Sequence, residues 1–164
     1  MRHLKLKFKI KGISEKKIVY VVKTLQKYKS SLQTAMGKRI VLDFKNGEIH
    51  IQEKFKNDEF KSAKSYGRLE LKDFSEQIDE GLPEELIRSL KILDEVEKWL
   101  NLLTEQEKEV VFWRYINHDF EREKGFYKTL SFEKIGEKLG IDKKKVWRIA
   151  EKAIGKIIQH IEGA

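Results

Sequence analysis

The residues of this sequence best suited to binding chemistry form a short cationic run near its C-terminal end. Lys143, Lys144 and Lys145 are consecutive, and Trp147 and Arg148 follow within about one helical turn. An ammonium group binds phosphate as a point charge, whereas a guanidinium can donate two parallel hydrogen bonds to phosphate or to O6 and N7 of guanine. Because a lone lysine run is more often a solvated surface, the run indicates a polyanion site only if a suitable scaffold presents it.

The stretch "SFEKIGEKLGIDKKKVWRIAEKAIGKIIQHI" predicts such a scaffold over residues 131–161, namely two helices joined by a tight turn. Ser131 is suited to the N-cap of the first helix, and Gly140 to the left-handed position just past its end. Asp142 is suited to cap the second helix. Helical periodicity gives that second helix one apolar face, consisting of Val146, Ile149, Ala150, Ala153, Ile157 and Ile161. We therefore expect a helix-turn-helix.

The cations of the second helix lie mostly opposite or beside this apolar face. A helix-turn-helix inserts the start of its second helix into the major groove, where the first residues meet base edges and nearby lysines meet phosphates. We expect duplex DNA to be contacted by Lys143, Lys144, Trp147 and Arg148, with further contacts from Ser131, Lys134, Lys145 and Lys152. Trp147 is equally well explained as a packing residue.

The C-terminal third resembles region 4 of bacterial primary-type sigma factors. The shared positions are Leu103-Thr104, Arg114-Tyr115, Ile135-Gly136, Leu139-Gly140-Ile141, Val146, Ile149, Lys152-Ala153 and Lys156. The same segment is similar to sigma-like phage regulators of the ArpU and RinA type, which control late genes. The resemblance implies a winged-helix-like superfamily fold, a role in transcription regulation, and RNA polymerase as a partner beside double-stranded DNA.

The chain departs from the sigma pattern in the residues that read bases. Sigma recognition helices usually carry Arg-Glu-Arg where this chain has Lys143–Lys145, and Arg-Gln where it has Trp147-Arg148. The resemblance therefore implies the docking mode but not recognition of a −35 element. No stretch resembles sigma region 2, so we do not expect a complete sigma factor.

Charge and periodicity divide the chain into three parts and predict an α+β fold. The net charge is +8, and residues 1–60 hold 15 Lys and Arg against 6 Asp and Glu, which favours a polyanion partner. Residues 1–53 predict a small basic β-α-β-β unit, with a strand over 4–10, a helix over 14–37 and a hairpin around Asn46-Gly47. Residues 54–82 predict a charged linker, with one short strand over 68–74.

Residues 83–164 predict a mostly helical domain. A long helix is expected to start at Pro83, with an apolar stripe formed by Leu86, Leu90, Leu93, Val96, Leu100 and Leu103. The run "TEQE" from Thr104 to Glu107 predicts a capping box at the next helix. Residues 117–129 are polar with aromatic residues near the end, and predict a loop.

Composition also limits the classes of function. The chain has no cysteine, hence no disulfide or thiolate metal site, and its four histidines have no metal-ligand spacing. We expect no catalytic residue, metal or cofactor. Without an apolar run of about 20 residues or a signal sequence, the chain is expected to be cytoplasmic, with no membrane partner. Three alternatives stay open: a phage DNA-packaging protein like a small terminase subunit, which predicts a homo-oligomeric ring, a protein–protein adaptor that does not bind DNA, and a nuclease.

Overall fold

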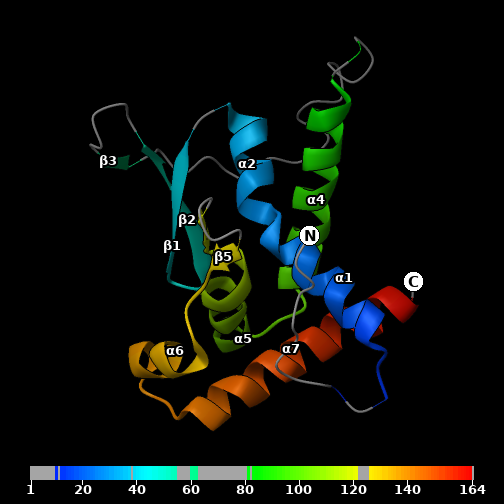
Figure 1. The fold of residues 1–164 in the computed structure, drawn as a ribbon, viewed down its shortest axis with the longest axis vertical. Coiled ribbons are helices and arrows are strands. Elements are labelled where there is room, and N and C mark those ends of the chain that lie inside the picture. The colour runs from blue at the N-terminus through cyan, green and yellow to red at the C-terminus, as the bar shows by residue number, and fades with distance from the viewer. Residues whose placement is uncertain are drawn as a thin grey trace.

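A computed structural model describes residues 10, 12–37, 39–54, 60–62, 81, 83–121 and 126–163. Helices dominate and strands are short, so the α+β class is confirmed at this level. In Figure 1 the last helix, α7 (Lys143–Gly163), runs along one side of the molecule, with α6 (Phe132–Leu139) at its start and α1 (Glu15–Gln26) near its end.

The predicted helix over 14–37 is two helices, α1 and α2 (Tyr28–Met36). At Lys27 the backbone N–H donates to both Lys23 O (3.2 Å) and Thr24 O (3.1 Å), which tightens the turn between them. The break has a packing reason. After it α2 lies against α4 (Glu84–Leu100), whereas α1 lies against α7, and one straight helix could not reach both partners.

The predicted hairpin is confirmed. β1 (Ile40–Lys45) and β2 (Glu48–Lys54) pair antiparallel, and both Asn46 (φ 53°) and Gly47 (φ 75°) have the positive φ that a tight hairpin turn requires. A third strand, β3 (Phe60–Ser62), pairs with β2 inside the segment predicted as a linker. The predicted strands over 4–10 and 68–74 lie outside the described residues, apart from Ile10, which is in no regular element.

The helix expected after Pro83 is α4, in which Leu90, Leu93 and Val96 of the predicted stripe are buried. Pro83 itself is the N-cap and not the first helical residue. The capping box opens α5 (Glu105–Val111), which continues directly into one turn of π-helix, η2 (Phe112–Ile116).

The prediction of a loop over 117–129 is wrong in part. β4 (Asp119–Glu121) and β5 (Phe126–Lys128) pair antiparallel within it. Aromatic residues favour strands, but strands of three residues are too short to produce a recognisable alternation in a sequence.

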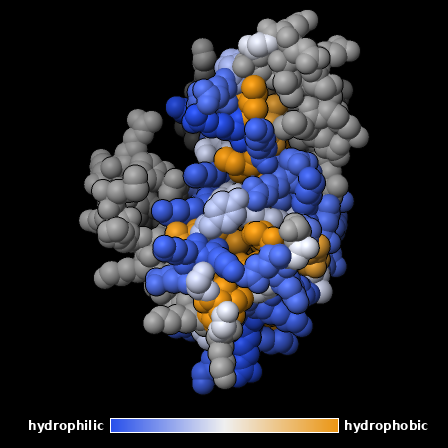
Figure 2. All heavy atoms as spheres, turned by 90° about the vertical axis from the view of Figure 1, so that its right-hand side faces the viewer, coloured by the Kyte–Doolittle hydropathy of each residue, from blue (hydrophilic) through white to orange (hydrophobic). Residues whose placement is uncertain are grey.

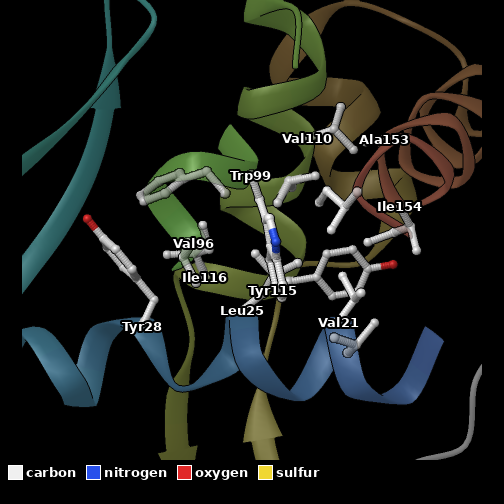
Figure 3. Packing of buried hydrophobic residues seen from close by; sticks show 14 of the residues in the cluster. Val21, Leu25, Tyr28, Val96, Trp99, Val110, Tyr115, Ile116, Ala153 and Ile154 are labelled. Atoms are coloured by element: carbon white, nitrogen blue, oxygen red, sulfur yellow. The ribbon is translucent and has the colours of Figure 1, made fainter. Parts of the chain in front are cut away.

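One hydrophobic cluster joins helices from the N-terminal and C-terminal parts of the described chain. It contains buried residues of α1 and α2 as well as of α4, α5, η2, α6 and α7, so residues on both sides of the predicted 54–82 linker share a core. Figure 3 shows Val21 and Leu25 of α1, Trp99 of α4, Tyr115 of η2 and Ile154 of α7 around one centre. The N-terminal helices therefore help to hold α7 in place.

Candidate nucleic-acid interface

Helix α6 has the two end residues that the sequence predicts. The Ser131 side chain accepts a hydrogen bond from Lys134 N (3.2 Å), as an N-cap does. Gly140 follows the helix in the left-handed conformation, with φ 71°. Because this conformation is unfavourable for residues with a Cβ, Gly140 both ends α6 and turns the chain toward α7.

Gly136 allows that turn to fold back onto α6. Ile141 N donates to Gly136 O (2.9 Å), and a Cβ on Gly136 would lie only 2.6 Å from Ile141 O. The close neighbour is a backbone atom, which cannot rotate away as a side chain can. The glycine therefore fixes how closely the turn approaches the first helix of the pair.

The buried face of α7 is wider than the predicted stripe. Val146, Ala150, Ala153 and Ile157 are buried as expected, but Ile149 is only partly buried and Ile161 is 36% exposed. Ile154 and Ile158, absent from the predicted stripe, are buried instead. The reason is that α7 packs against α5 and α6 and also, along its second half, against α1.

A partly buried ion pair fastens α7 to α5. Lys156 Nζ donates to Glu107 Oε1 over 2.6 Å, and the same oxygen accepts from Thr104 N over 2.8 Å. Burial alone would raise the pKa of the Glu107 carboxyl, but the hydrogen bonds from Lys156 and Thr104 outweigh it and hold the pKa below its usual range. Glu107 thus stays ionised, and it serves the capping box and the ion pair together.

Two cation–ring contacts fasten α6 to η2. The Arg114 guanidinium lies 4.5 Å from the centre of the Phe132 ring and donates to Leu130 O over 2.9 Å. The Lys138 ammonium lies 4.3 Å from the centre of the Trp113 ring. These contacts, which the sequence patterns did not reveal, orient α6 and so determine where α7 begins.

Seven of the eight predicted contact residues are exposed, and these are Ser131, Lys134, Lys143, Lys144, Lys145, Arg148 and Lys152. None of the six cations among them forms an ion pair within the described residues. Trp147 is partly buried against the hydrophobic cluster, which favours the packing explanation for much of its ring. The Ser131 oxygen is already used as a helix cap.

Lys144, Arg148 and Lys152 follow one another at four-residue steps on α7. At about 1.5 Å per residue they form a row roughly 12 Å long, comparable to the width of the major groove of B-DNA. The hollow beside the turn is different, because Glu133, Glu137 and Asp142 line it against the single cation Lys143. A duplex would therefore be attracted to the row and not to that hollow.

The structure also brings the N-terminal segment close to this face. Arg148 and Lys152 line a second hollow with Ile10 and Ile13, beside the helical position of Gly155. No periodicity or motif in the sequence relates residues so far apart in the chain. The proximity follows from the packing of α1 on α7.

Other classes of site receive no support from the described residues. They contain no group of three or more His, Asp or Glu side chains that could hold a metal ion. Within the same residues, none of the helices is both long and apolar enough to cross a membrane. No protein-family model, curated protein or solved structure matches the chain.

Proposed function

We propose that the chain is a sequence-selective DNA-binding regulator of transcription that docks the start of α7 into the major groove. The observation that carries the proposal is the division of α7 into two faces. Val146, Ala150 and Ala153 are fully buried on one face, while the cationic row Lys144–Arg148–Lys152 is exposed on the other.

Rigid presentation of the row supports this proposal. α7 is held from several sides by the core, by the Glu107–Lys156 ion pair and by the turn at Gly140. A helix fixed in this way loses little conformational freedom on binding, so more of the interaction energy becomes affinity. The guanidinium of Arg148 supplies the bidentate donor that reads guanine, and the lysines supply phosphate contacts.

Regulation of transcription, with RNA polymerase as a second partner, rests on the resemblance to sigma region 4 and is therefore an analogy. The DNA-packaging alternative requires several copies of the chain to form a ring. A molecular mass in solution that corresponds to a monomer or a dimer would oppose it. The adaptor alternative requires a helix pair without duplex affinity. The observation that disfavours it is the row of exposed cations Lys144, Arg148 and Lys152, which form no ion pair within the described residues.

The experiment is selection of duplexes from a random pool by the full-length protein, followed by titration of the selected and of a scrambled duplex. Arg148→Ala should weaken binding to the selected duplex by about 1–3 kcal/mol and change the scrambled duplex much less. Lys152→Ala should weaken both duplexes alike and reduce the salt dependence by about one phosphate contact.

Lys91→Ala is the matched control, because Lys91 is exposed on α4 and forms no ion pair within the described residues. It should leave both affinities unchanged. Failure to enrich any duplex would refute sequence-selective binding. Equal losses from Arg148→Ala on both duplexes would remove the base-reading role of α7.

A further inference from the structure

A second surface lies where α1 meets the last turns of α7, far along that helix from its cationic start. Lys16, Lys17, Tyr20, Ile158 and Ile161 line a hollow that exposes almost only carbon atoms; we refer to it as the α1–α7 hollow. Figure 2 views this side of the molecule and shows hydrophobic residues gathered among hydrophilic ones. Three large hydrophobic side chains are exposed among the described residues, and two of them, Tyr20 (49%) and Ile161 (36%), line this hollow.

Contacts within the protein hold the side chains around the α1–α7 hollow in place. The Tyr20 hydroxyl donates to Glu95 Oε1 over 2.8 Å, and the Tyr20 ring meets Trp99 edge-on with 6.2 Å between ring centres. Lys17 and Glu162 form an ion pair that joins the two helices beside the hollow. A half-exposed aromatic ring that is held in one orientation is typical of binding hot spots, because little side-chain entropy remains to be lost.

The charge around the hollow indicates what it would accept. Lys16 and Lys23 fall on the same face of α1 as Tyr20, and Lys27, the residue that follows α1, continues the three- and four-residue steps; all three lysines are exposed. None of them forms an ion pair within the described residues. Of the acidic side chains beside the hollow, Glu162 is paired with Lys17 and Glu95 accepts from the Tyr20 hydroxyl, so the three lysines leave an excess of positive charge that attracts an acidic partner. A second copy of the chain docked by this face would bring the same lysines together and would be repelled.

We propose that the α1–α7 hollow binds an acidic amphipathic helix of a partner protein. Apolar side chains of that helix would cover the exposed Tyr20 and Ile161 at the mouth of the hollow, while its carboxylates would pair with Lys16, Lys23 and Lys27. Ile158 lies 14 residues beyond Lys144, or about 21 Å along the helix, so both surfaces could be occupied together. The inference does not depend on DNA binding, and α1 lies outside the segment that resembles sigma region 4.

The test uses the full-length protein and a displayed library of random peptides, selected on the wild type alone and then compared with the Ile161→Asp variant. Enriched peptides should combine Asp and Glu with large apolar residues at three- and four-residue spacing. Fluorescence anisotropy of the best peptide should show a Kd at least about tenfold weaker for Ile161→Asp, since a charge would enter an apolar contact. Lys23→Glu should weaken binding by a few-fold, and more at low salt than at high salt.

Leu102→Asp is the matched control, because Leu102 is the third exposed large hydrophobic residue and is not part of the hollow. It should leave the peptide affinity unchanged. Since Ile161 lies near the end of α7 and Lys23 is exposed, both variants should melt close to the wild-type temperature. If Ile161→Asp unfolds, Lys23→Glu still decides the question.

Three results would overturn the proposal. Peptides that bind the wild type and Ile161→Asp equally would show that the hollow is not their site, and failure to enrich any peptide would show that it has no such ligand. A wild-type mass that doubles with concentration, but not in Ile161→Asp, would assign the hollow to a second copy. Duplex affinity lost in Ile161→Asp would assign it to nucleic acid.

Discussion

Two glycine-to-alanine substitutions of identical chemistry should change stability in opposite directions. Gly136 lies in α6 against the turn, and Gly155 lies in α7 with nothing within 4 Å of the position that a Cβ would take. Alanine is preferred over glycine inside a helix by about 1 kcal/mol, so this gain is common to both variants. Any difference between them therefore reports the surroundings of the two positions.

At Gly136 the surroundings should outweigh the helix preference. A Cβ placed 2.6 Å from Ile141 O has to displace the turn, and overpacking of this kind costs about 1–3 kcal/mol. The displacement also strains the 2.9 Å hydrogen bond from Ile141 N to Gly136 O, which contributes about 1 kcal/mol. After subtraction of the helix preference of about 1 kcal/mol, Gly136→Ala should destabilise the protein by about 1–3 kcal/mol.

Gly155→Ala should instead stabilise the protein by about 0.5–1 kcal/mol. Urea unfolding followed by far-UV circular dichroism measures both changes, provided that the slope of the transition is the same in all three proteins. The same turn positions α7, so Gly136→Ala should also weaken duplex binding, whereas Gly155→Ala should not. A Gly136→Ala variant as stable as the wild type would refute the account of the turn.

Two further substitutions test what holds the helix pair. Glu107→Gln should cost about 1–2 kcal/mol at neutral pH by removing the charged partner of Lys156, and Glu109→Gln on the same helix should cost little. Because the folded-state pKa of Glu107 lies below the ordinary value of 4.5, its contribution is present above that pH and is lost as pH falls through the folded-state pKa. The difference in unfolding free energy between wild type and Glu107→Gln should therefore shrink in acid; a constant difference would contradict the ion-pair account. Ser131→Ala should cost about 1 kcal/mol in the same unfolding assay by removing the α6 cap, and no change would mean that the 3.2 Å contact is not a working cap.

Local patterns predicted the elements whose ends are set by side-chain chemistry. Thr104 and Glu107 form the expected capping box, Ser131 and Gly140 delimit α6 as expected, and Asn46-Gly47 forms the expected hairpin turn. In each case the determining contact spans a few residues, so the sequence alone contains the information. The exposure of the cations at the candidate interface was also predictable, because helical periodicity places them mostly off the apolar face of α7.

Long-range packing explains what the patterns missed. The break at Lys27 depends on α1 and α2 having different partners, and the burial of Ile154 and Ile158 in place of Ile161 depends on α1 packing along α7. The Glu107–Lys156 ion pair joins residues 49 positions apart. None of these features leaves a periodic signal, because each is decided by an element distant in the chain.

The central claim is that the start of α7 contacts duplex DNA, and lysine footprinting tests it most directly. The full-length protein would be acetylated with and without a saturating amount of the selected duplex, and the modified lysines would be quantified by mass spectrometry. Lys143, Lys144, Lys145 and Lys152 should become protected, while the exposed Lys16 and Lys23 of α1, and Lys27 just after it, should react as before. Protection of the α1 lysines with continued reactivity of Lys143–Lys145 would contradict the claim. It would place the duplex near α1, at the C-terminal end of α7.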